Sequence, residues 1–107
     1  MRLVVLALAA LAFTAAPAQA RSCRTFDISG GYITSLSVRG VSCATGKSVA
    51  VAWTKCRREH GRKGRCTHKV KRYSCAEKRV SIPTEFDGVV TCRKGSKRVK
   101  FSYQQNL

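Results

Sequence analysis

The chain has very little negative charge. Five acidic residues stand against 21 lysines and arginines among 107 residues, which gives a formal net charge of +16 at pH 7. Paired carboxylates, which many hydrolases need, are nearly absent, because only Glu85 and Asp87 lie close together and both belong to a turn-like segment. The imbalance of charge predicts attraction to polyanions but carries no information about the fold.

Common catalytic and metal-binding motifs are also missing. The sequence has no Gly-rich phosphate loop, no G-x-S-x-G elbow and no C-x-x-C pair. We therefore expect no metal, no cofactor and no enzymatic activity. One enzymatic alternative stays open, because His60 and His68, set among cations, could serve as the acid and base of a small secreted ribonuclease.

One long apolar run stands at the start of the chain. Residues 1–20 contain an arginine at position 2, an apolar run from Leu3 to Phe13 and a cleavage-type A-x-A site ending at Ala20. This order predicts a secretory signal peptide, because the run is shorter than the roughly 20 residues that a membrane span needs. Residues 21–107 are then the exported domain. Cleavage removes one basic residue and no acid, so the net charge becomes +15.

All the cysteines lie in the exported part. An even number of cysteines in a small exported domain predicts three disulfide bonds, which would stabilise a modest core against repulsion among the cations. Cys56 and Cys66 flank a glycine-containing loop that can return on itself, so we expect them to be paired. The pairing of the others stays open. The expected half-cystines are Cys23, Cys43, Cys56, Cys66, Cys75 and Cys92.

Hydrophobic spacing predicts one helix over residues 43–56. Ser42 is a suitable N-cap, and Gly61 suits a left-handed position after the helix end. The apolar stripe of this helix consists of Gly46, Val49, Ala50, Trp53 and Cys56.

Short alternating runs predict strands on both sides of the helix. One strand lies within residues 27–42, after a turn at Gly30 and Gly31. Residues 82–88 have the composition of a connection. One helix with several antiparallel strands predicts an α+β fold: a single small disulfide-stapled domain with one helix packed on a small, mostly antiparallel sheet. The later strands are expected at Val70–Cys75, Arg79–Ile82, Val89–Cys92 and Val99–Tyr103.

The last two strands predict a hairpin with a definite register. With a two-residue II′-type turn at Gly95 and Ser96, Cys92 faces Val99, Val90 faces Phe101 and Gly88 faces Tyr103, all on one side. The other side then carries Arg93 opposite Arg98 and Thr91 opposite Lys100. Like charges directly opposite each other destabilise a sheet, so this face is either a solvated surface or a cationic surface that binds anions.

The strand before this hairpin is harder to place. In a regular strand, Val80 and Ile82 point to one face and Cys75 points to the other. All three can therefore face one core only if a bulge or break interrupts residues 76–78. The orientation of Cys75 stays open.

Basic residues concentrate between Lys55 and Arg72. Within this segment, residues 61–66 fit the pattern x-B-B-x-B-x, where B is basic, that is associated with heparin-like polyanions. The alternative is a loop whose charge only aids solubility. With the cationic face of the hairpin, the segment supplies the candidate polyanion-binding residues: Arg57, Arg58, Arg62, Lys63, Arg65, Lys69, Lys71, Arg72, Arg93, Arg98 and Lys100.

These observations favour a secreted binding module for extracellular polyanions: a cell-wall polymer, an acidic polysaccharide, a lipid headgroup or the backbone of a nucleic acid. The alternative is a secreted protein-interaction or inhibitor domain whose stapled loop enters the acidic cleft of a protein partner. In either case we expect a monomer without a membrane span after cleavage. Steep weakening of binding by salt would favour the first function, and a salt-tolerant one-to-one complex the second.

Several short motifs are spread over most of the exported part. They are Val41-Ser42-Cys43-Ala44, Val49-Ala50, Trp53, Cys56, Tyr73-Ser74-Cys75, Ile82-Pro83, Phe86-Asp87-Gly88, Val90-Thr91-Cys92 and the run from Val99 to Tyr103-Gln104-Gln105-Asn106. Together they resemble a group of short secreted, cysteine-containing proteins of high-GC Gram-positive bacteria that has no assigned activity. The resemblance implies an exported, stapled α+β domain and transfers no site residue.

Overall fold

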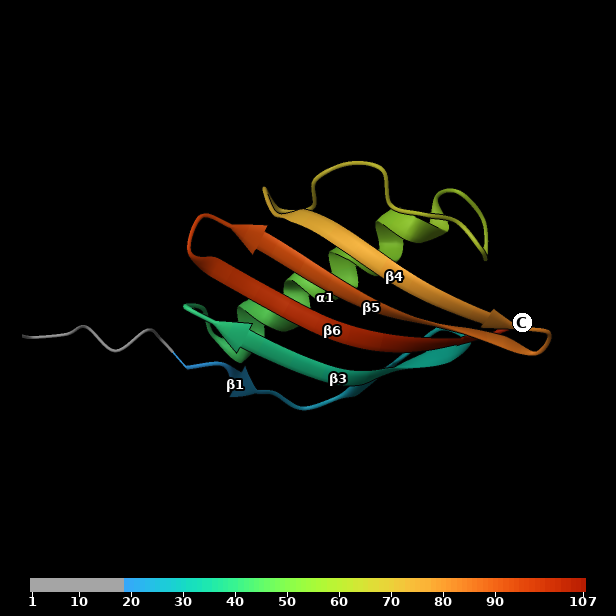
Figure 1. Ribbon diagram of the computed structural model, residues 1–107, viewed down its shortest axis with the longest axis horizontal. Helices are drawn as coiled ribbons and strands as arrows, with labels where there is room; N and C mark the ends of the chain where they lie inside the picture. Colours follow the sequence, from blue (N-terminus) through green and yellow to red (C-terminus); the bar gives the residue numbers. More distant parts are fainter. Residues whose placement is uncertain (1–18) are drawn as a thin grey trace, which may run out of the picture.

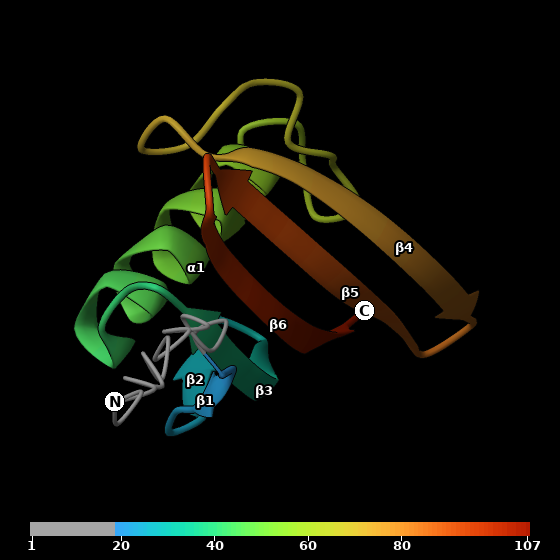
Figure 2. The same cartoon turned by 60° about the vertical axis from the view of Figure 1, so that its left-hand side comes forward.

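The fold is a curved antiparallel sheet with one helix on its inner face (Figures 1 and 2). A computed structural model describes residues 19–107, so residues 1–18 of the predicted signal peptide lie outside the described residues. The sheet has six strands in the order β1-β3-β6-β5-β4, and β2 also pairs with β3. The elements are β1 (Arg21–Ser22), β2 (Phe26–Ile28), β3 (Gly31–Arg39), α1 (Cys43–Arg58), β4 (Ser74–Ile82), β5 (Glu85–Lys94) and β6 (Lys97–Asn106).

The predicted α+β fold with one helix on a mostly antiparallel sheet is confirmed, although the sheet is larger than expected. Helix α1 begins after its predicted N-cap, since the Ser42 side chain accepts a hydrogen bond from the Thr45 amide at 3.1 Å. The predicted stripe of α1 is buried against the inner face of the sheet. The core includes Ile33, Leu36, Val38, Val49, Ala50, Trp53, Val70, Tyr73, Phe86, Val90, Val99, Phe101 and Tyr103.

The predicted hairpin register of β5 and β6 is confirmed. Cys92 pairs with Val99, Val90 with Phe101 and Gly88 with Tyr103. Gly95 has a φ of 59°, as the first central residue of a II′-type turn requires. The connection between β4 and β5, however, is shorter than residues 82–88, because it contains only Pro83 and Thr84.

Strand β4 presents two charged side chains, Glu77 and Arg79, to the core and Val80 and Ile82 to solvent. It pairs with β5 without a register shift from Ser74 to Ile82, so the bulge considered for residues 76–78 does not form. Cys75 faces inward opposite Cys92. Val80 is instead 71% exposed and Ile82 49% exposed. The hydrophobic alternation of this strand therefore points away from the core.

Three disulfide bonds join the described cysteines, as predicted: Cys23–Cys43, Cys56–Cys66 and Cys75–Cys92. The first ties the N-terminal segment to the start of α1. The second ties the end of α1 to the loop that follows it, and this pairing was expected from the sequence. The third crosses between β4 and β5 at directly paired residues.

A buried polar network lies between the helix end and the sheet. The Arg57 side chain is 0% exposed, and its guanidinium lies 4.8 Å from the Tyr103 ring centre and 5.3 Å from that of Phe86. Arg57 donates to Gln105 Oε1 at 3.0 Å. Nearby, the Glu77 carboxylate accepts hydrogen bonds from Tyr103 Oη and from the Arg79 guanidinium. The inward-facing charges of β4 are thus partners within this network.

Tyr103 should make the protein sensitive to alkali. Burial, followed by the hydrogen bond to Glu77, raises the pKa of Tyr103 above its ordinary value. In the unfolded chain this phenol ionises near pH 10. The stabilisation is therefore complete below about pH 10 and is lost as the pH rises further. Urea unfolding between pH 8.5 and 11 should show a shallower alkaline loss for Tyr103→Phe, and an unchanged slope would contradict this assignment.

Candidate functional site

A row of three arginines crosses the outer face of the sheet. Arg93 pairs with Arg98 across β5 and β6, and Arg98 pairs with Arg39 across β6 and β3. Paired residues of an antiparallel sheet point to the same side, so the three guanidinium groups share one face. Lys100 lies in the next row, between Ser37 and Thr91. Figure 1 shows that α1 lies behind the sheet and leaves this outer face uncovered.

The chain before β4 makes a strained turn that carries two more cations. Val70 and Tyr73 exchange backbone hydrogen bonds of 3.1 and 2.8 Å. The two residues between them, Lys71 and Arg72, have positive φ values of 48° and 68°. Such values are uncommon for residues other than glycine, and they persist where the surrounding structure imposes them, often at functional sites. This turn projects two exposed basic side chains into solvent.

The strained turn and the arginine row lie at the same end of the sheet, with Lys71 on the side of α1 and the row on the outer face. Ser74 pairs with Arg93, and the Lys94 ammonium lies 5.7 Å from the Tyr73 ring centre. In Figure 1 this end is at the left, where the β5–β6 turn lies beside the start of β4. We call the resulting surface the basic tip. It comprises Arg39, Lys71, Arg72, Arg93, Lys94, Lys97, Arg98 and Lys100.

No carboxylate neutralises the basic tip within residues 19–107. The ion pairs of this part of the chain involve Glu59 or Glu77 and none of the basic tip residues. Asp87 lies on the same strand as Arg93 but six residues away, about 20 Å at about 3.3 Å per residue. That separation exceeds the screening length of about 8 Å at physiological salt. Arg39 Nε is also buried without a hydrogen-bond partner among the described residues.

The structure separates the basic residues predicted from the sequence. Lys69 lies close to the start of β4, near the basic tip, which itself contains five of the other predicted residues. Those five are Lys71, Arg72, Arg93, Arg98 and Lys100. At the opposite end, Arg62 lines a hollow of about 430 Å³ with Arg58 and the C-terminal residue Leu107.

Three of the predicted residues are held by the protein itself. Arg57 is buried in the polar network, so it is not part of the solvent-facing surface. Arg58 donates to Gln105 Oε1 at 3.0 Å and to the Ser29 carbonyl. Arg65 pairs with Glu77 at 3.3 Å. The exposed Lys63 side chain stays free to contact a ligand, but its backbone carbonyl is bound by Arg79 at 2.8 Å.

Sequence reasoning missed part of the cationic surface. Arg39 joins the arginine row only through the pairing of β3 with β6, which no local pattern predicts. Lys94 and Lys97 flank the predicted turn, and this position in the sequence was a signal that they belong to the cationic surface. Lys47 and Lys55, two helical turns apart on α1, line a hollow of about 390 Å³ with Lys71. Their i, i+8 spacing was a usable signal, because it places them on one exposed helix face.

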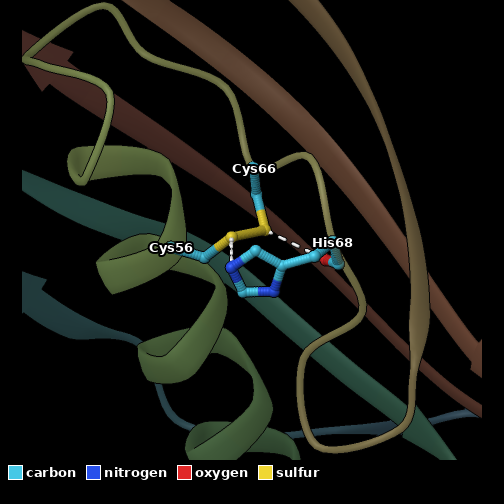
Figure 3. A group of neighbouring side chains, drawn as sticks. All are labelled: Cys56, Cys66 and His68. Carbon is cyan, nitrogen blue, oxygen red and sulfur yellow. Dashed lines mark hydrogen bonds between the residues drawn. A yellow bond between two sulfur atoms is a disulfide. The ribbon is translucent and has the colours of Figure 1, made fainter.

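No hydrogen bond among residues 19–107 joins the two histidines of the ribonuclease alternative, His60 and His68. His60 is exposed just after the end of α1. His68 instead lies at the Cys56–Cys66 bridge, with Nε2 3.3 Å from Cys56 Sγ (Figure 3). Both sulfurs of this group are bonded to each other, so neither is a thiolate available to a metal.

Helix α1 is not long and apolar enough to cross a membrane, and the rest of residues 19–107 contains no other helix. Comparison of the chain with known protein families, curated proteins and solved structures gives no match. Inference about function therefore rests on the surface itself, and the basic tip is its most distinctive feature.

Proposed function

We propose that the protein is a secreted binding module for extracellular polyanions and that the basic tip is its binding surface. The observation that carries this proposal is the unpaired cross-strand row of Arg39, Arg98 and Arg93. Like charges in register destabilise a sheet, so an anion that lies across the row would relieve a repulsion that the free protein bears. Guanidinium groups also bind phosphate, sulfate and carboxylate groups with paired hydrogen bonds.

Two further features support this function. The strained turn at Lys71 and Arg72 holds a pair of cations at the same end of the sheet as the row, at a backbone cost that a purely solvating charge would not need. Few aromatic side chains are available to stack on bases, since Tyr32 is the only exposed aromatic residue among residues 19–107. Binding should therefore depend on the charge density of the polymer and not on its sequence.

The test compares two variants with equal net charge. The tip variant is Arg93→Thr, Arg98→Thr and Lys100→Thr, and the control variant is Arg24→Gln, Arg62→Gln and Lys63→Gln. On a heparin column in a salt gradient, the tip variant should elute at clearly lower salt than the control. With duplex DNA as probe, the slope of log affinity against log salt should fall by up to about 3, about 0.9 for each lost phosphate contact.

Equal elution of the two variants would overturn the proposal, because total charge would then explain the binding. A salt-tolerant complex with a single protein would favour the alternative of an interaction or inhibitor domain. Export is tested separately by the intact mass of the protein recovered from the medium. That mass should correspond to residues 21–107 less six hydrogens, one pair for each disulfide bond.

A further inference from the structure

The Cys56–Cys66 bridge differs from the other two disulfides because an imidazole lies against it. Figure 3 shows the His68 ring beside the two sulfurs, with Nε2 at 3.3 Å from Cys56 Sγ. Among the described residues, the sulfurs of the other two bridges form no hydrogen bond with a side chain. Only this bridge therefore has a titratable side chain within hydrogen-bond distance of a sulfur, where it can donate a proton to a thiolate formed when the bridge opens.

The hydrogen bond made by His68 Nδ1 sets the tautomer of the ring. Nδ1 donates to the Lys69 carbonyl at 2.9 Å, which leaves Nε2 to face Cys56 and, when protonated, to donate to it. The charged groups that face the ring are Glu59, whose Oε2 lies 3.6 Å from Nε2, and the neighbouring Lys69. The hydrogen bond to the Lys69 carbonyl, followed by the interaction with Glu59, raises the pKa of His68.

Solvent reaches one sulfur of the bridge more easily than the other. Cys56 is 2% exposed, whereas Cys66 is half-buried. Cys66 also lines a hollow of about 210 Å³ together with Thr67, His68, Lys69, Ser74 and Cys75. An incoming thiolate would therefore meet Cys66 first, and the Lys69 ammonium would favour its approach.

The loop between the two cysteines does not depend on the bridge alone. The Arg79 guanidinium donates to the carbonyls of Lys63 and Gly64, both at 2.8 Å. Arg57 donates to the Arg62 carbonyl at 2.9 Å. These three hydrogen bonds hold the loop against the domain, so the bridge can open while the fold persists.

We propose that the Cys56–Cys66 bridge is a thiol-exchange site for low-molecular-weight thiols. The incoming thiolate attacks Cys66 Sγ and forms a mixed disulfide, while the Cys56–Cys66 bond breaks and Cys56 leaves as a thiolate beside the His68 imidazolium, which protonates it. A second thiolate attacks the outer sulfur of the mixed disulfide and releases Cys66 as a thiolate, which takes a proton from water. Two thiols are oxidised to one disulfide, and the bridge gains two electrons and two protons.

The test uses the folded, oxidised protein with glutathione as the probe. Samples quenched by alkylation and digested for mass spectrometry should show that this bridge opens at least about tenfold faster than the other two, with glutathione attached to Cys66 only. The rate of opening, divided by the concentration of glutathione thiolate, should be highest at pH 6 and should fall as His68 loses its proton. His68→Gln should lower the pH 6 rate about tenfold and flatten this profile, whereas the control His60→Gln should leave it unchanged.

Three outcomes would overturn the proposal. They are earlier opening of either other bridge, attachment of glutathione to Cys56, and wild-type kinetics in His68→Gln. If that variant does not fold, the order of opening and the position of the adduct in the wild-type protein still decide. None of these measurements depends on the binding of a polyanion, so the proposed function is tested independently.

Discussion

Replacement of Glu77 by alanine should lower the free energy of unfolding by about 3–5 kcal/mol, the usual cost of removing one partner from a buried ion pair. The side chains of Glu77 and Arg79 are 7% and 8% exposed and lie 2.9 Å apart. Without the carboxylate, the Arg79 and Arg57 guanidinium groups would remain buried near each other with no anion among them. Tyr103 would also lose its hydrogen-bond acceptor.

Urea unfolding at neutral pH, with the disulfide bonds intact, measures this loss. Asp87→Ala is a matched control, because Asp87 is an exposed carboxylate on the neighbouring strand and its loss should change stability by less than about 0.5 kcal/mol. Similar urea midpoints for the two variants would show that the inward charges of β4 contribute little to stability.

Replacement of Arg57 by alanine should have an effect of similar size, about 3–5 kcal/mol, for a different reason. Among residues 19–107, Arg57 is the largest fully buried side chain, and its removal leaves a cavity between the Trp53, Phe86 and Tyr103 rings. It also removes the hydrogen bond to the Arg62 carbonyl that holds the following loop.

The variant Arg57→Met distinguishes the loss of side-chain volume from the loss of the charge. Arg57→Met keeps most of the volume and needs no partner for a charge, so it should cost less than half as much as Arg57→Ala. Lys55→Ala, an exposed position on the same helix, serves as the control and should be nearly neutral. Thermal or urea unfolding of these variants gives the comparison. Equal losses for methionine and alanine would mean that the charge, and not the volume, stabilises this region.

Elements with strong local signals were predicted well from the sequence. The helix stripe places Trp53 and Cys56 on one side, and the turn residues Gly95 and Ser96 set the register of the last hairpin. Both signals act within a few residues, so neither needs the rest of the fold. The Cys56–Cys66 pairing belongs to the same class, since its loop is short.

Strand β4 shows where local signals are insufficient. The alternating apolar residues Val80 and Ile82 suggest that their side of the strand faces the core, but both are exposed to solvent. The inner face is set instead by Cys75 opposite Cys92 and by the buried pair of Glu77 and Arg79. Their further partners come from distant parts of the chain: the Tyr103 hydroxyl for Glu77, and the backbone carbonyls of the loop after α1 for Arg79. Burial of a charge depends on such partners, and the sequence of one strand does not contain them.

The same distinction holds for the candidate site. The amino-acid sequence alone predicts the cationic character of the domain, its half-cystines and the pairing of Arg93 with Arg98. The positions of three groups follow from the tertiary structure alone: Arg39 completes this row, Lys71 and Arg72 lie at the same end of the sheet, and Arg57 is buried in the core. Net charge depends on composition alone, whereas a binding surface depends on cross-strand register and on packing between elements far apart in sequence.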